Sequence, residues 1–124
     1  MKKNSPLVSI ITPNFNGEKY LEETIKSVIN QTYKKIEYIL IDGKSTDQSL
    51  KIIRKYKNHI SYFESKKDKN IFHAVDKGIK KSTGELIIWI NSDDILHPKA
   101  AENVVKVFTS NSNINWINGI CGYI

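Results

Sequence analysis

The feature that most constrains this chain is a regular alternation between short apolar runs and longer segments with helically spaced apolar residues. Each short run ends in a turn or polar group, as buried strands of a parallel sheet do. Each longer segment shows the spacing of an amphipathic helix. Strands that alternate with helices are joined by right-handed crossovers, which places helices against a mostly parallel sheet. The predicted fold class is therefore α/β, a Rossmann-like three-layer α/β/α sandwich.

The pattern also predicts where the elements lie. Ser45 is the expected N-cap of the second helix, because Gln48 follows at capping-box spacing. Pro13 is expected after the first strand, because proline cannot donate a hydrogen bond within a central strand. Gly78 inside a helix costs about 1 kcal/mol relative to alanine, which indicates close packing. We expect strands at 8–11, 36–41, 60–64, 86–90 and 116–124, and helices at 18–31, 45–56, 71–81 and 98–110.

Apolar spacing assigns a buried face to each helix. In helix 18–31 Thr24 and Ser27 fall on the outer side. The single cysteine, Cys121, cannot form an internal disulfide, and its apolar neighbours make it a core candidate. The predicted inner residues of helix 71–81 are Ile71, Ala74, Val75 and Ile79.

Length and composition limit the class of protein. A chain of 124 residues, 40% apolar and 26% charged, suits one globular domain, so residues 1–124 are expected to form a single unit. No apolar run approaches the roughly 18 residues that span a bilayer, and the N-terminus lacks a signal-peptide core, so the expected location is cytoplasmic. The net charge is +6, but one arginine and no basic run flanked by aromatics argue against a nucleic-acid partner.

Polar residues follow three of the predicted strands. Thr12, Pro13 and Asn14 follow the first, Asp42 follows the second, and the segment 91–94 follows the fourth. Carboxyl ends of parallel strands share one edge of the sheet, and ligands bind there where the strand order reverses. If strands 8–11 and 86–90 are neighbours, these groups surround one cavity.

The acidic turn after strand 86–90 is the strongest candidate site. Asp93 and Asp94 repel each other unless a cation or a proton intervenes. Mg²⁺ or Mn²⁺ is typically held by one or two carboxylates together with substrate phosphates, so we hypothesise a metal–phosphate site. The competing explanation is a turn with acidic residues before a helix. Asp42 has a similar competing role, as a loop-capping aspartate.

Several nucleotide-binding and catalytic motifs are missing. No G-x-G-x-x-G follows the first strand and no G-x-x-x-x-G-K-[ST] occurs, which argues against a dinucleotide dehydrogenase and a P-loop NTPase. The three histidines lack zinc spacing, and neither Ser45 nor Ser92 has an adjacent base. A receiver-type phosphoacceptor domain needs an acidic pair after its first strand, which this chain lacks.

In combination and in this order, several segments resemble the N-terminal, donor-binding portion of family 2 glycosyltransferases, which have the GT-A fold. The resemblance covers essentially the whole chain. It implies transfer of a sugar from a nucleoside diphosphate sugar to an acceptor hydroxyl, as in cell-surface polysaccharide synthesis. The segments are VSIITPNFN at 8–16, LEETIKSVINQTY at 21–33, EYILIDGKSTD at 37–47, KGI at 77–79, TGE at 83–85 and NSDDILHP at 91–98.

The resemblance also implies roles for individual residues. Thr12 matches a residue that lines the nucleotide pocket, and Asp42 an aspartate that contacts the base or ribose. Asp93 matches the last aspartate of the D-x-D motif, the main ligand of Mg²⁺ or Mn²⁺, with Asp94 as a second candidate. That metal would neutralise the diphosphate leaving group. The expected substrate-binding residues are Thr12, Pro13, Asn14, Asp42, Asp68, Asn91 and Asp93.

The sequence departs from the family pattern at a few positions. Asn91 replaces the usual first aspartate of D-x-D, and Gly43 replaces an aspartate that reads the base in many members. Asn70 and His73 replace a glycine and an aspartate common around this helix.

A catalytic base is not found in this sequence. No carboxylate follows Glu102, so the base is expected beyond Ile124, in an acceptor-binding part. We therefore expect a truncated domain that is inactive alone; the alternative is a non-catalytic nucleotide-sugar or metal-binding module. Expected partners are the donor and a saccharide or lipid-linked acceptor. Peripheral membrane association of the full-length protein and a homodimer through the apolar C-terminal segment are further hypotheses.

Overall fold

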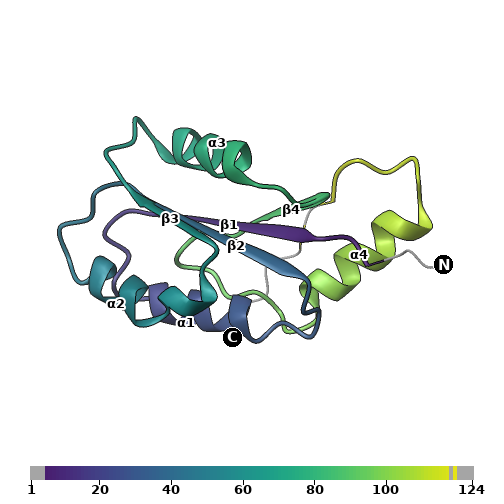
Figure 1. Cartoon of the computed structure of the whole chain (residues 1–124), viewed down its shortest axis with the longest axis horizontal. Coiled ribbons are helices and arrows are strands. Elements are labelled where there is room, and N and C mark those ends of the chain that lie inside the picture. Colours follow the sequence, from purple (N-terminus) through teal and green to yellow (C-terminus); the bar gives the residue numbers. More distant parts are fainter. Residues whose placement is uncertain (1–4, 118, 120–124) are drawn as a thin grey trace.

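The computed structural model describes residues 5–117 and 119. The four strands form one parallel sheet in the order β3-β2-β1-β4. Helix α3 covers one face, and α1, α2 and α4 cover the other (Figure 1). This arrangement confirms the predicted α/β sandwich. The elements are β1 Val8–Asn14, α1 Leu21–Ile29, β2 Ile36–Asp42, α2 Ser49–Lys55, the short 3-10 helix η1 Lys57–His59, β3 Tyr62–Ser65, α3 Ile71–Lys81, β4 Leu86–Trp89 and α4 Ala100–Ser110.

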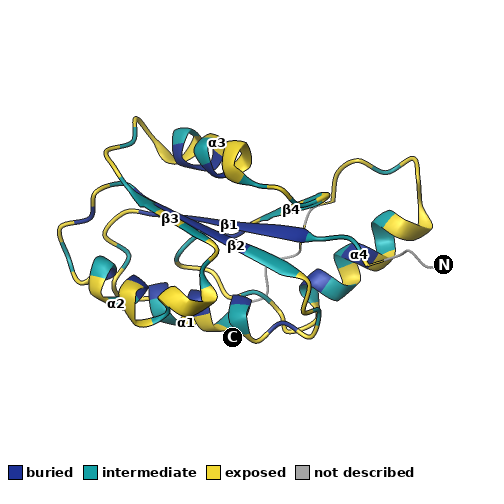
Figure 2. Cartoon of the chain, viewed as in Figure 1, coloured by how far each residue is buried: buried dark blue, intermediate teal, exposed yellow. Residues whose placement is uncertain are grey.

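The core lies on both faces of the two central strands. All seven residues of β1 are buried, as are the last five of β2, which Figure 2 shows in dark blue. Side chains alternate between the faces along each strand. Ile10 and Leu40 pack toward α1 and α2, whereas Ile11 and Ile39 pack toward α3. Runs that are apolar on both faces are thus explained by helices on both sides of the sheet.

Helix α3 lies very close to β1. A Cβ atom on Gly78 would come within 2.5 Å of Ile11 Cγ2, so the close packing predicted at this glycine is confirmed. The predicted inner face is partly wrong, because Ile71 and Ile79 are 42% and 44% exposed. A single helix touches a sheet along a narrow stripe, here Ala74, Val75 and Gly78, and the residues at its flanks remain outside it.

Pro13 lies inside the central strand β1, so its predicted position after the strand is wrong. Carbonyl groups of Leu7 and Ile11 point toward β4, and that of Asn14 toward β2. By this alternation the Pro13 nitrogen faces the β4 side. β4 pairs with β1 only over Val8–Ile11, so no β4 carbonyl lies opposite that nitrogen. The proline therefore costs the ladder no hydrogen bond.

Strand β4 is half-exposed, although the sequence predicted a buried strand. Leu86 and Ile88 pack against the core, whereas Ile87 and Trp89 are 43% and 41% exposed. Within the described residues β4 pairs only with β1 and forms one edge of the sheet. The predicted strand at 116–124 is absent from described residues 116, 117 and 119. The remainder of that segment, including Cys121, lies outside the described residues.

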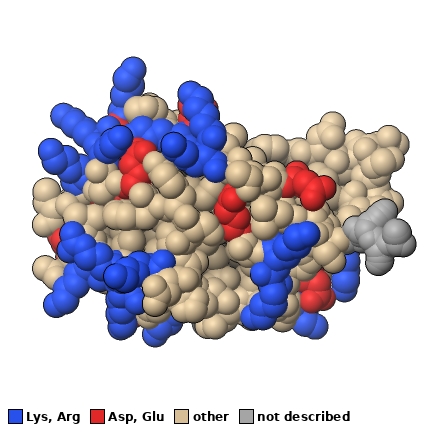
Figure 3. Space-filling model, in the orientation of Figure 1, with Lys and Arg blue, Asp and Glu red and all other residues tan. Residues whose placement is uncertain are grey.

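Charge is unevenly spread over the surface. On the face shown in Figure 3, Lys and Arg side chains gather over the loop before α3 and over α2. Lys66, Lys67 and Lys69 of that loop are exposed, in agreement with a lysine-rich surface in contact with solvent. None of the helices in the described part of the chain is long and apolar enough to cross a membrane.

Candidate functional site

The predicted polar groups converge at the carboxyl edge of the sheet. Strand β1 lies between β2 and β4, and Asn14 is paired in register with Asp42. The expectation that strands one and four are neighbours is confirmed, so the crevice between β1 and β4 is where the strand order reverses. Asn14 and Asp42 lie on one side of this crevice, and the turn 91–94 continues from β4 on the other.

Asp42 is a fully buried carboxylate that accepts four hydrogen bonds. Its Oδ1 accepts from Asn14 Nδ2 at 2.8 Å and from Ser45 Oγ at 2.6 Å. Its Oδ2 accepts from Ser45 N and Ser65 Oγ, both at 2.8 Å. Buried charges require such partners, and the loop-capping role considered for Asp42 describes this geometry. It leaves no exposed surface of Asp42 for a base or ribose.

The capping box predicted at Ser45 is wrong. Helix α2 begins at Ser49, and its cap residue Gln48 makes no side-chain capping bond. Ser45 instead donates its hydroxyl to Asp42, and its Oγ accepts from Asn16 N at 2.8 Å. A buried carboxylate three residues away is a stronger partner for the hydroxyl than a helix N–H group.

Asn14 connects the Asp42 cluster with the acidic turn. Its Nδ2 donates to Asp42, while its buried Oδ1 has no hydrogen-bond partner among the described residues. A Cβ on Gly17 would collide with Asn14 Oδ1 and lie 2.8 Å from Ser92 Oγ. The end of β1, the loop after it and the acidic turn therefore meet at Gly17. The absence of a side chain at Gly17 allows this close approach.

Thr12 and Pro13 lie beneath the site rather than at its surface. Both residues are buried, and Thr12 has no exposed area. The Thr12 hydroxyl and the Tyr38 hydroxyl share a hydrogen bond of 2.9 Å. Burial raises the pKa of Tyr38, which stays a neutral hydroxyl. In this geometry Thr12 supports the strand end from inside the core.

Asn16 connects two loops at the carboxyl edge through hydrogen bonds, a role that the sequence alone did not predict. Asn16 has a left-handed backbone, φ 49°, and its Oδ1 accepts from Thr46 N at 2.8 Å and Asp47 N at 3.3 Å. Asparagine tolerates this conformation better than most residues, and the Asn-Gly turn was the available signal. The neighbouring Phe15 is 65% exposed and lies beside Gly43.

Helix α1 holds the acidic turn in place through side-chain hydrogen bonds. The Thr24 hydroxyl donates to the carbonyl oxygens of Ser92 at 3.0 Å and Asp94 at 2.6 Å. Further along, Leu96 N donates to Ser27 Oγ at 3.0 Å. Gln31 donates its amide to His97 O and accepts from Ala101 N.

Thr24 and Gln31 are fully buried, so the outward position predicted for Thr24 is wrong. Apolar spacing assigns the polar residues of a helix to its solvent-exposed face. Polar side chains are buried when hydrogen bonds replace their water, and the partners here come from a distant segment.

Asp93 and Asp94 are both exposed on the turn. Burial raises the pKa of Asp94, and the negative charge of Asp93 adds to this effect. Exposed carboxylate oxygens of this kind suit Mg²⁺ or Mn²⁺. Residues 5–117 and 119 contain no cluster of three His, Cys, Asp or Glu side chains that could hold a metal. The two carboxylates alone would leave a bound cation to take its remaining ligands from substrate and water.

Asn91 accepts hydrogen bonds with both its side-chain oxygen and its backbone carbonyl. Its Oδ1 accepts from Trp89 Nε1 at 2.7 Å, and its backbone carbonyl accepts from Asp94 N at 3.1 Å. Among the described residues the two amide hydrogens of Asn91 have no acceptor, so they are available to a ligand. Asn91 is thus arranged as a neutral donor beside the acidic pair.

Asp68 lies in the loop between β3 and α3, and its side chain is largely buried. Lys77 Nζ lies 2.5 Å from Asp68 Oδ1 and 3.1 Å from Glu64 Oε2, and the bond to Asp68 is the first cause of the raised pKa of Lys77. A Cβ on Gly43 would lie 3.4 Å from Asp68 Oδ2, so this loop touches the β2–α2 loop. The same Cβ would lie 3.4 Å from Phe15 Cδ1, so Gly43 lies between Asp68 and Phe15.

Asn70 and His73, the departures noted in the sequence, cap helix α3. Asn70 Oδ1 accepts from His73 N at 2.9 Å, which is an N-cap bond. His73 Nδ1 accepts from Lys69 N at 3.1 Å, and the ring lies 3.9 Å from Asp68 Oδ1. These two residues therefore stabilise the loop that carries Asp68.

A parallel α/β sheet with an acidic turn at its switch point is the architecture of an α/β protein that binds its ligand at the carboxyl edge. The chain belongs to glycosyl transferase family 2, whose family model matches residues 9–120. The resemblance stated from the sequence is thereby confirmed.

Two relatives illustrate how much of a longer protein the chain spans. An uncharacterised glycosyltransferase of Rickettsia typhi is 38% identical over 125 residues, which cover 99% of this chain and 39% of that protein. Poly(ribitol-phosphate) beta-N-acetylglucosaminyltransferase TarP of Staphylococcus aureus is 37% identical over 111 residues, 86% of this chain and 34% of that protein. The chain thus spans less than half the length of these relatives.

Solved structures match the fold. TarS of S. aureus, residues 1–349, in complex with UDP-GlcNAc has a TM-score of 0.77 and 25% identity over 84% of this chain and 31% of that one. The mannosyltransferase PcManGT of Pyrobaculum calidifontis, in complex with GDP-Man and Mn²⁺, has a TM-score of 0.72 and 22% identity, which shows similarity of fold alone. That match covers 84% of this chain and 32% of PcManGT.

Proposed function

We propose that this chain forms the donor-binding part of a glycosyltransferase that takes its sugar from a nucleoside diphosphate sugar with the help of Mg²⁺ or Mn²⁺. The observation that carries this proposal is the exposed Asp93-Asp94 pair at the crevice between β1 and β4. Similarity to TarS, crystallised with UDP-GlcNAc and with UDP, supports a nucleotide-sugar donor. Similarity to TarP, named a poly(ribitol-phosphate) beta-N-acetylglucosaminyltransferase, supports a place in cell-surface polysaccharide synthesis. The cytoplasmic location expected from the sequence remains part of the proposal.

In this proposal Asp93 and Asp94 hold the metal. Once bound, the metal supplies positive charge that offsets the charge of the diphosphate leaving group. Thr24 keeps the turn in place through its bonds to Ser92 and Asp94. A turn held in advance loses less conformational entropy when the ligand binds, which favours affinity.

The nucleoside is assigned to the surface on the other side of β1. Phe15 offers an exposed ring and Asp68 a carboxylate beside it, separated by the small Gly43. The buried Asp42 cluster holds the two loops that carry this surface. Asp42 and Thr12 therefore act as supports for the nucleotide surface in this proposal, not as its contacts.

The second half of the reaction is assigned to the part of the protein that this chain does not span. An acceptor hydroxyl needs a general base within hydrogen-bond reach. The sequence places no carboxylate after Glu102. We propose that the base and the acceptor site come from the additional length seen in the relatives, and that this chain alone binds donor without turnover.

Thermal melting tests the proposal. The melting temperature is measured with UDP-GlcNAc, UDP and GDP-mannose, each with and without Mn²⁺. A ligand at 100 times its Kd stabilises the folded state by about 2.7 kcal/mol, so at least one nucleotide sugar is expected to raise the melting temperature in the presence of metal. Asp93→Ala is expected to abolish the metal-dependent part, and Asp76→Ala on α3 is the matched control. The proposal is wrong if no nucleotide shifts the melt, or if Asp93→Ala leaves the shift intact.

A further inference from the structure

Two large aromatic side chains lie exposed beside the acidic turn. Phe72 of α3 is 67% exposed and Trp89 of β4 is 41% exposed. Their ring centroids are 5.9 Å apart and the planes cross at 83°. With Asn91 they form a surface that we call the aromatic corner. Neighbouring exposed aromatic rings are uncommon on soluble domains and point to a binding surface.

The aromatic corner combines ring faces with hydrogen-bond donors. Trp89 Nε1 donates to Asn91 Oδ1 at 2.7 Å, so the indole N–H is satisfied and the amide is oriented. The Asn91 amide hydrogens remain as donors at the edge of the two rings. A pyranose ring has the complementary chemistry, because it presents C–H groups on its faces and hydroxyl oxygens around its rim.

The aromatic corner is continuous with the proposed metal–diphosphate site. Asn91 and Asp94 are joined by a backbone hydrogen bond of 3.1 Å, and Asp93 lies between them in sequence. In a nucleoside diphosphate sugar, the transferred sugar is bonded directly to the second phosphate. If Asp93 holds that diphosphate through a metal, the sugar is close to Asn91, which lies two residues before Asp93.

We infer that Phe72, Trp89 and Asn91 form the subsite for the transferred sugar of the donor. The two rings pack against the C–H faces of the sugar, and the Asn91 amide donates to one of its hydroxyl oxygens. This inference rests on the proposed function, since it needs the diphosphate at the acidic turn. It adds contacts to a donor that carries a sugar and none to the free nucleoside diphosphate.

The test compares a nucleotide with and without its sugar. Dissociation constants for UDP-GlcNAc and UDP, and for GDP-mannose and GDP, are measured by calorimetry in the presence of Mn²⁺. Phe72→Ala is expected to weaken binding of the nucleotide sugar about 3- to 10-fold, the scale of one aromatic contact, while UDP or GDP binds as before. The matched control is Phe63→Ala, which removes a 39% exposed ring from β3 at the opposite edge of the sheet.

A second measurement reports on Trp89 directly. In a Trp116→Phe background, Trp89 is the one remaining tryptophan of the sequence. Its fluorescence is expected to change more with the nucleotide sugar than with the nucleotide alone. Equal changes with both ligands contradict the inference.

The outcomes separate the two proposals. If neither nucleotide sugar binds, the proposed function fails. If nucleotide sugars bind but Phe72→Ala leaves their affinity unchanged, or weakens the free nucleotide equally, the sugar subsite is wrong and the proposed function stands. Self-association that disappears with Phe72→Ala, without any change in sugar-dependent affinity, also overturns the subsite and assigns the aromatic corner to a second copy of the chain.

Discussion

At the scale of single residues, two aspartates near the carboxyl ends of strands in the same sheet differ completely in environment. Asp42 is buried and accepts four hydrogen bonds, whereas Asp93 is exposed on the acidic turn. A buried carboxylate surrounded by donors holds structure together, and an exposed one remains available to ligands. The same substitution should therefore destabilise the fold strongly at Asp42 and hardly at all at Asp93.

Asp42→Ala is expected to lower the free energy of unfolding by about 3 kcal/mol, because it leaves the donors of Asn14, Ser45 and Ser65 buried without an acceptor. Asp93→Ala is the matched control and should change it by less than about 0.5 kcal/mol. Urea unfolding followed by circular dichroism measures both. Equal effects of the two substitutions would contradict the structural role of Asp42.

The acidic pair makes a prediction about proton binding. The pKa of Asp94 is raised first by burial and second by the charge of Asp93. A raised carboxyl pKa means that the folded chain binds the proton more tightly than the unfolded chain, so ionised Asp94 opposes folding as pH rises through this pKa. Asp93→Asn removes the second cause and is expected to lower the pKa of Asp94 without returning it to its ordinary value.

Carboxyl chemical shifts followed by NMR against pH measure this change. Mg²⁺ is expected to lower the pKa of Asp94 in the unsubstituted protein, because a nearby cation favours the ionised form. A pKa of Asp94 that does not respond to Asp93→Asn would show that the two carboxylates do not interact.

At the scale of elements, α1 positions the acidic turn. Hydrogen bonds join Thr24 and Ser27 of α1, and Gln31 just beyond its end, to the segment 92–101. The partners lie 66 to 70 residues away in sequence. The helix therefore contributes one apolar face to the core and a row of polar side chains to the site. This division explains why Thr24 of α1, and Gln31 just after the helix, are as deeply buried as Leu21 and Ile25.

Thr24→Val tests this role with little change in side-chain shape. It removes the donor to Ser92 O and Asp94 O, so the free energy of unfolding should fall by about 1 to 2 kcal/mol, and the Asp94 amide should exchange faster with deuterium. Thr109→Val is the matched control in α4, because the Thr109 hydroxyl bonds only within its own helix among the described residues. If both variants lose the same stability, the bonds to the turn contribute nothing specific.

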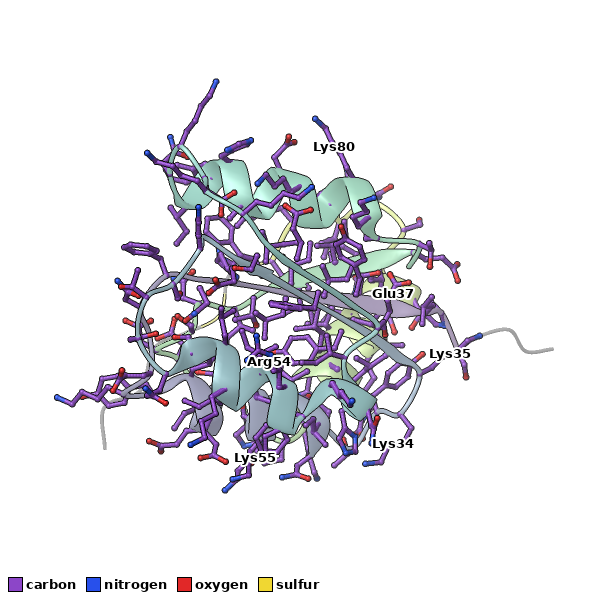
Figure 4. All side chains as sticks on the ribbon, turned by 60° about the vertical axis from the view of Figure 1, so that its left-hand side comes forward. Lys34, Lys35, Glu37, Arg54, Lys55 and Lys80 are labelled. Atoms are coloured by element: carbon purple, nitrogen blue, oxygen red, sulfur yellow. The ribbon has the colours of Figure 1, made fainter. Side chains whose placement is uncertain are left out.

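At the scale of the whole molecule, Glu37, whose side chain is labelled in Figure 4, joins three segments at the amino end of the sheet. Its carboxylate in β2 accepts from Ser9 of β1 at 2.8 Å and from the backbone and hydroxyl of Thr83 in the α3–β4 loop. Burial alone would raise the pKa of Glu37, but the hydrogen bonds from Thr83 and Ser9 outweigh it and lower the pKa below its usual 4.5. Glu37 therefore stabilises the fold in its ionised form.

The sign of the pH dependence follows from this lowered pKa. The stabilisation by Glu37 is present above about pH 4.5, the ordinary pKa, and is lost as pH falls through the lowered value. Glu37→Gln should reduce stability at neutral pH, and the difference from the unsubstituted protein should shrink as acid protonates Glu37. Urea unfolding over a series of pH values measures that difference, and a constant difference would contradict the prediction.

Much of the fold could be predicted because its signals are local. The alternation of apolar runs and amphipathic segments predicted the α/β class, the bounds of α3 and the placement of the acidic turn after β4. The terminal strand was not found in the described residues of 116–124, and Ser45 does not cap α2. Capping patterns compete with any stronger acceptor that the fold brings near, as Asp42 does here.

The sequence by itself determined the order of elements, and with it the carboxyl edge where Asn14, Asp42 and Asp93 had to gather, because parallel strands joined by helices all end on one side. Only the tertiary structure decided what each of these residues does there. Burial of Asp42 and Thr24, and exposure of Trp89, depend on which distant segments pack against them. Sequence periodicity predicts on which side of its own helix or strand a side chain lies. The three-dimensional fold decides whether that side chain contacts hydrogen-bond donors, water or a ligand.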